Sequence, residues 1–141
     1  MEAAVTNAAR RTTALSFIFA AGALALSSFT TPVASAEPAL DGNWNGGGVV
    51  VLPSGDKERA RCRATFRKNG GGYKMHAVCT TPSARAAQTA ELVRVSGNRY
   101  SGEFFNAEFN VSGIIRVTVN GNSLSAFLSG GGAQANLSLS R

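Results

Sequence analysis

The chain has 141 residues, which is short enough that a single domain is expected. Fourteen Lys and Arg residues against eight Asp and Glu residues give a formal net charge of +6. This excess is enough for non-specific attraction to acidic surfaces, but it does not by itself indicate nucleic-acid binding.

Residues 1–36 have the pattern of a signal peptide. An arginine pair at 10–11 precedes an uncharged apolar run over 15–26, and small residues at 34–36 form the pattern that a signal peptidase cleaves. The apolar run is shorter than the roughly 20 residues needed to span a bilayer, although an uncleaved anchor helix is the alternative. We predict a cleaved signal peptide, no transmembrane segment after cleavage, and a single domain over 37–141 in the periplasm or outside the cell.

The first predicted strand covers residues 44–52. Trp44, Val50 and Leu52 share one parity with two glycines between them, so they are expected on one face of the strand. The Pro-Ser-Gly-Asp sequence at 53–56 then predicts a turn.

The stretch over 58–80 predicts a β-hairpin. Two runs alternate between a small or apolar face and a charged face, and a Gly-rich turn at 69–72 separates them. If the turn centres on 70–71, Cys62 lies directly opposite Cys79 on the inner face. Two cysteines in an exported domain of this size are expected to form a structural disulfide, which contributes about 3 kcal/mol by the chain-entropy estimate.

Five further strands are expected in the second half of the chain, each bounded by turn-forming residues. In the first of them, Ala90 and Leu92 favour one phase while Val93 and Val95 favour the other, and a bulge would reconcile the two. Asn-Gly at 120–121 is the strongest hairpin signal of the chain. The expected ranges are 85–95, 100–107, 109–119, 123–128 and 133–141.

About eight strands joined by short turns predict an all-β fold in which neighbouring strands pair antiparallel. We expect a small up-and-down barrel, closed on itself, with one cross-strand disulfide. Inward positions alternate between small and large residues, so the interior is expected to be filled, and a pocket for an apolar ligand is the alternative. An open two-sheet sandwich is the alternative.

The Gly-Asn-Trp sequence at 42–44 resembles the G-x-W signature at the first strand of calycin barrels, which include lipocalins and avidins. In that group the Trp closes one end of the barrel, and an Arg from the last strand often lies across it. The resemblance implies a stacked pair of Trp44 with Arg141, which ends the last expected strand with inward parity. Such a pair is worth on the order of 1 kcal/mol.

The layout of 37–141 is also similar to two groups of small exported proteins. G-x-W-x-G-G-G, E-R-x-R-C-R-A, a second Cys and S-G-x-F, in that order, resemble an uncharacterised alphaproteobacterial group without a known activity. An early Trp, one disulfide in the first half and eight strands are similar to secreted inhibitors of bacterial metalloproteases. Those inhibitors insert their N-terminal tail into the protease cleft, so this likeness implies that Glu37 to Asp41 form such a tail.

The outer face of the predicted hairpin is the strongest candidate for a binding site. In the expected register Arg67 faces Lys74, and Thr65 faces His76. Like charges across a strand pair are unfavourable, so a sheet that keeps them can use them to hold an anion, which guanidinium groups bind well. The alternative is a solvated face that only keeps the barrel soluble. This basic face comprises Arg59, Arg61, Arg63, Arg67, Lys74 and His76.

No catalytic or metal site is predicted, because the one histidine, His76, is expected on the solvent-facing side and no cluster has metal-ligand spacing. We therefore predict a monomeric, non-catalytic binding module without a cofactor. Its expected partners are an anionic polysaccharide, lipid head groups or an acidic protein. Nucleic acid is disfavoured because no aromatic residues are interleaved on the basic face. The alternatives are a protease inhibitor acting through its tail and a calycin-like carrier of a small apolar ligand.

Overall fold

The computed structural model describes residues 29–33 and 39–141. Apart from 29–33, the predicted signal peptide lies outside the described residues, and so does its cleavage site. Within the described part of the chain, no helix is long and apolar enough to cross a membrane.

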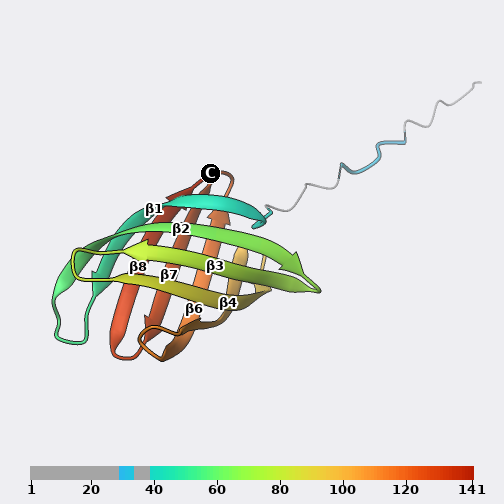
Figure 1. The fold of residues 1–141 in the computed structure, drawn as a ribbon. Coiled ribbons are helices and arrows are strands. Elements are labelled where there is room, and N and C mark those ends of the chain that lie inside the picture. The colour runs from blue at the N-terminus through green and yellow to red at the C-terminus, as the bar shows by residue number, and fades with distance from the viewer. Residues whose placement is uncertain (1–28, 34–38) are drawn as a thin grey trace, which may run out of the picture. The chain divides into compact units, whose positions relative to one another are not determined.

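Eight antiparallel strands form a closed barrel, because each strand pairs with the next along the chain and the last pairs with the first. In Figure 1 the first four strands cross the later ones at a steep angle, an arrangement typical of small barrels. The predicted all-β up-and-down barrel is thereby confirmed, and the open sandwich is excluded. The strands are β1 (Gly42–Val51), β2 (Lys57–Asn69), β3 (Gly72–Thr80), β4 (Arg85–Ser96), β5 (Arg99–Asn106), β6 (Val111–Asn120), β7 (Ser123–Gly130) and β8 (Ala133–Ser140).

The hairpin of β2 and β3 has the predicted register. Cys62 is paired with Cys79 across the two strands, and the two residues form a disulfide. A structural disulfide is typical of proteins in an oxidising compartment, such as the periplasm or the extracellular space.

The ambiguous phase of β4 is resolved by a local irregularity. Ala90 and Leu92 are buried in the barrel, whereas Val93 and Val95 are 59% and 60% exposed. The pairing of β4 with β5 shifts its register between Arg94 and Ser96, which is the effect of a bulge.

Close packing of backbones explains the glycine run of β1. A Cβ atom added at Gly48 would lie 1.9 Å from the backbone oxygen of Asn136 on β8. The same atom added at Gly46 would lie 2.1 Å from the oxygen of Ser138. Only glycine permits this approach, and glycines at such positions let a strand bend so that the barrel can close.

Candidate functional site

The two ends of the barrel are built differently. The closed end is where β1, β3, β5 and β7 begin and their partners end. The open end is where the odd-numbered strands end and the even-numbered strands begin. Large buried side chains gather at the closed end, where Trp44, Phe66 and Tyr100 are each at most 3% exposed.

A short segment before β1 seals the closed end. Leu40 and Trp44 are fully buried, and the indole Nε1 of Trp44 donates a hydrogen bond of 2.9 Å to the backbone oxygen of Leu40. Arg141 covers the indole from outside, with Cζ 4.4 Å from the ring centroid, at cation–π distance. Its Nη1 donates to the backbone oxygen of Asp41 at 2.8 Å, so both termini of the barrel are tied to this end.

The open end holds a cavity of about 470 Å³. Most of its wall is apolar and includes Val50, Val111, Leu128, Ala86 and Ala135. The interior is therefore filled at one end and hollow at the other, whereas the sequence had suggested a filled barrel throughout. The hollow arises because the inward residues near the open end are mostly too small to meet at the barrel axis.

An aromatic ring stands at the mouth of this cavity. Phe109 lies in the loop between β5 and β6, lines the cavity and is 56% exposed. Its backbone N–H and that of Glu108 donate to the side-chain oxygen of Asn106 at 3.2 and 3.1 Å. Asn106 is itself only 6% exposed, so a buried amide fixes the loop that carries the ring.

The loop between β3 and β4 forms another part of the rim. Thr81, Ser83 and Ala84 line the cavity, and the Ser83 hydroxyl donates a hydrogen bond of 2.7 Å to Oε2 of Glu58. Hydrogen bonds from the side chains of Thr81 and Ser83 lower the pKa of Glu58 below its ordinary value, since they favour the charged carboxylate.

A single polar group reaches the inner part of the cavity without a partner. Gln88 on β4 lines the cavity and also a small void of about 20 Å³ deeper in the barrel, next to Cys79 and Leu128. Its side-chain oxygen Oε1 is buried and has no hydrogen-bond partner in the protein. Among the described residues it is the one buried side-chain nitrogen or oxygen atom in this condition.

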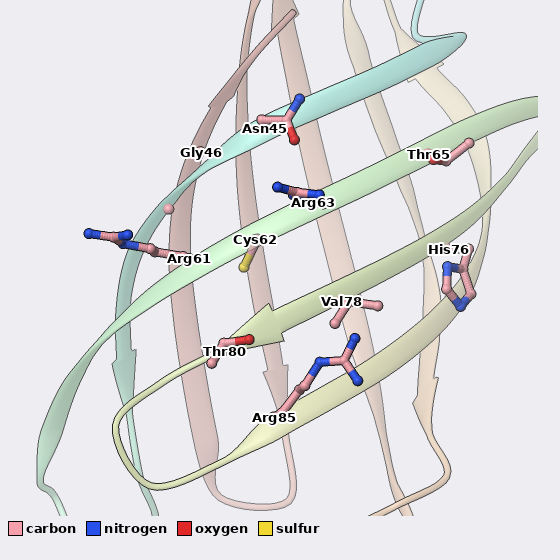
Figure 2. A pocket seen from close by; sticks show the side chains of 11 residues that line it. Asn45, Gly46, Arg61, Cys62, Arg63, Thr65, His76, Val78, Thr80 and Arg85 are labelled. Carbon is pink, nitrogen blue, oxygen red and sulfur yellow. The ribbon is translucent and has the colours of Figure 1, made fainter.

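The basic face lies on the outside of β2 and β3, and all six of its residues are exposed. Three of them, Arg61, Arg63 and His76, border a broad shallow depression over β1 to β4 (Figure 2). The depression also includes Arg85, which the sequence analysis missed. Arg85 on β4 pairs with Thr80 of β3, which in turn pairs with Arg61 of β2, so the two arginines lie on the strands on either side of β3. The other three members, Arg59, Arg67 and Lys74, lie outside this depression.

The guanidinium groups around the depression do not converge on one point. Figure 2 shows Arg61 extending over β1, whereas Arg85 extends from β4 towards Val78. Charge spread in this way suits an extended anionic surface better than one small anion. No group of three or more His, Cys, Asp or Glu residues in the described ranges could hold a metal ion.

Comparisons with known proteins identify the fold and nothing more specific. No model of a known protein family matches the chain, and no curated protein matches it. Among solved structures, the redesigned β-barrel mFAP1 bound to DFHBI aligns over 72% of this chain and 94% of its own length, at 11% identity and a TM-score of 0.61. A second redesigned β-barrel aligns over 72% and 90% at 11% identity, with a TM-score of 0.58.

A third structure, the secretory abundant heat soluble protein 4 from Ramazzottius varieornatus, aligns over 75% of this chain and 96% of its own, at 12% identity and a TM-score of 0.41. The two redesigned barrels, at this level of identity, show that the chain has the fold of a small β-barrel.

Proposed function

We propose that this protein is a non-catalytic binding protein that holds a small, mainly apolar ligand in the cavity at the open end of its barrel. The observation that carries this proposal is the cavity itself, which measures about 470 Å³ and has an apolar wall. Protein interiors are normally packed as densely as organic crystals, so a hollow of this size is exceptional. Ligand pockets of roughly 300–1,000 Å³ with apolar walls and few polar groups are the usual sites for small molecules.

The contrast between the two ends supports a calycin-like reading. Calycin barrels, which the G-x-W sequence at 42–44 resembles, are closed at one end by the Trp, and here Trp44 and Arg141 lie at the end away from the cavity. The redesigned barrel mFAP1 is bound to DFHBI, so a barrel of similar fold can accommodate a small molecule. We propose the same use of the barrel for this chain, with a ligand of its own.

Ligand binding can be tested by mass and by blocking the cavity. Native mass spectrometry on protein purified without reduction would reveal a co-purified molecule, and the fluorescent probe ANS reports on an accessible apolar site. Ala86 points into the cavity from β4, while Ala87 is its outward neighbour. We expect Ala86→Leu to reduce ANS or ligand binding severalfold and Ala87→Leu to leave it unchanged. Equal binding by the two variants would contradict the proposal.

The basic face is a second candidate site, and the observation that favours it is the depression bordered by Arg61, Arg63 and Arg85. We propose that it contacts an extended anionic surface, such as a polysaccharide or lipid head groups, while the protein remains a monomer. Vesicles with anionic lipid test this directly. Arg61→Glu/Arg63→Glu should abolish binding at low salt, whereas the same charge change at the distant Arg99 and Arg116 should not. Equal loss in both variants would indicate only a net-charge effect.

Protease inhibition through the tail is the least favoured proposal. Leu40 is fully buried in the closed end, and the Asp41 carboxylate accepts a hydrogen bond from the backbone N–H of Lys68 at 3.2 Å. A segment held in this way is not free to enter a protease cleft. Glu37 and Pro38, the first residues of the proposed tail, lie outside the described residues.

A further inference from the structure

We infer that the ligand of the open-end cavity is a neutral, mainly apolar molecule that carries a hydrogen-bond donor, a hydroxyl or an N–H group, at its buried end, and that Gln88 receives this donor. The inference rests on the proposed function and adds to it the chemical class of the ligand and the residue that selects it. It starts from the unpartnered Oε1 of Gln88.

Gln88 occupies a position where an apolar residue would be expected. It has the inward parity of Ala90 and Leu92 on the same strand, both of which are buried in the core. A buried acceptor without a partner destabilises a protein, and such groups are rare in native structures. The unpaired acceptor of Gln88, which faces a cavity, is therefore best explained by a hydrogen-bond donor that the bound ligand supplies.

No side-chain donor of the described residues reaches Oε1 of Gln88. Asn106 is the cross-strand neighbour of Gln88, but its amide is oriented by the two backbone N–H groups of the 107–110 loop that its oxygen accepts, and its Nδ2 does not donate to Gln88. The other residues shared by the cavity and the deeper void are Cys79, which is bonded to Cys62 and has no S–H, and Leu128. The acceptor is thus open only towards the hollow interior.

The remaining wall defines the rest of the ligand. None of the residues that line the cavity is an Asp, Glu, Lys or Arg, so a charged group placed there would lose its hydration without gaining a counter-charge. The volume of about 470 Å³ corresponds to roughly 16 non-hydrogen atoms if each takes about the 30 Å³ of a liquid water molecule. A medium-chain alcohol or a hydroxylated ring compound matches these limits.

Two isomeric probes separate the donor from all other properties. 1-Decanol and methyl nonyl ether have the same atoms and nearly the same length, but only the alcohol can donate a hydrogen bond. Their affinities should be measured directly, by isothermal titration calorimetry, for the wild type, Gln88→Leu and Gln134→Leu. Gln134 lines the same cavity but is exposed at its mouth, so it provides the same chemical change without the buried acceptor.

We expect the preference for the alcohol over the ether to fall about tenfold in Gln88→Leu, which corresponds to one hydrogen bond of roughly 1.4 kcal/mol. Gln134→Leu should keep the wild-type preference. Because the comparison uses the ratio of two ligands, differences in their water solubility cancel between variants.

Each other outcome has a definite meaning. If both probes bind but the ratio is the same in all three proteins, the inference fails and the proposed cavity site stands; a water molecule in the void of about 20 Å³ would then satisfy Gln88. If neither probe binds the wild type, the proposed function fails and takes the inference with it. Thermal unfolding without ligand shows whether each variant is folded. If Gln88→Leu does not fold, Gln88→Met takes its place.

Discussion

The closed and open ends of this barrel use the same strands for opposite purposes. At the closed end, large side chains meet on the axis, and Leu40, Trp44 and Arg141 seal it with an indole hydrogen bond and a guanidinium stacked over the ring. At the open end, small residues leave a cavity of about 470 Å³, and Phe109 stands half-exposed at its mouth. The difference indicates that the stability of the barrel is concentrated at the closed end, and we propose that the open end is the one that binds a ligand.

This division has a physical basis. Filling the interior gains apolar burial and dispersion contacts, which stabilise the fold, while a hollow forfeits those contacts on the residues that line it. A protein of this size can carry one hollow end only if the other end is well packed and its strands are held together. The disulfide between Cys62 and Cys79 joins β2 and β3 between the two ends and adds to this support.

The largest effect is expected from removing Trp44, the buried side chain that closes one end of the barrel. We expect Trp44→Ala to lower the free energy of unfolding by about 3–5 kcal/mol, since it deletes a fully buried indole together with its hydrogen bond and its stacked arginine. Thermal denaturation followed by circular dichroism measures this loss, which should exceed about 15 °C.

Phe109→Ala is the control for that experiment, because it removes an aromatic ring at the open end. Its ring is 56% exposed, so its loss should cost less than about 0.5 kcal/mol of stability while weakening ligand binding. If the two variants unfold at the same temperature, stability is not concentrated at the closed end.

Adding volume at each end sharpens the comparison. Ala64 is an inward residue of β2, 4% exposed, and is paired with Trp44 of the closed end. Ala64→Leu should cost about 1–3 kcal/mol, because the void of about 20 Å³ that Ala64 lines is too small for the added carbon atoms. Ala86→Leu makes the same change where the cavity is, so it should be neutral or slightly stabilising. Urea unfolding of the two variants gives both values, and an equal loss in both would mean that the cavity is not accessible to a side chain.

Much of this architecture was predictable from the sequence. Alternation over 58–80 gave the hairpin register and therefore the pairing of Cys62 with Cys79, because a period of two and a short turn leave few alternatives. The turn signals fixed the number of strands, since Gly, Asn and Pro punctuate each of them. The phase of β4 could not be assigned, because Val93 and Val95 face solvent, where apolar residues are not expected from alternation.

The position of the cavity at one end of the barrel could not be predicted, for a different reason. In an up-and-down barrel the starts of odd strands and the ends of even strands lie at one end, so Trp44, Phe66, Tyr73 and Tyr100 all gather there. Alternation along each strand assigns the large residues to the inner face, but it does not show that they lie at the same end of the barrel. Gln88 was overlooked because it lies in the strand of uncertain phase, where its inward direction was not evident. Arg85 was overlooked because it joins the basic face only through the pairing of β4 with β3.

The smallest expected effect concerns the rim of the open end. The hydroxyl groups of Thr81 and Ser83 stabilise the carboxylate of Glu58 in the folded protein and lower its pKa. The Glu58 carboxyl therefore loses its proton at a lower pH in the folded protein than in the unfolded chain. The resulting stabilisation is complete above the pKa of the unfolded chain and is lost as the pH falls through the lower pKa of the folded protein. We expect Ser83→Ala to raise the pKa of Glu58, measured by NMR titration of its side-chain carboxyl carbon.

Acidification should act mainly on the loop that this carboxylate holds. Because Thr81, Ser83 and Ala84 line the cavity, protonation of Glu58 should change the amide signals of this loop and loosen one wall of the open end. The effect on overall stability is small, because the hydrogen bonds lie at the surface and compete with water. An unchanged titration midpoint in Ser83→Ala would show that the hydroxyl does not stabilise the carboxylate. The loop would then be held by the hydrogen bonds between Thr81 and Ala84, which include the backbone bond of 2.8 Å from Thr81 N–H to the oxygen of Ala84.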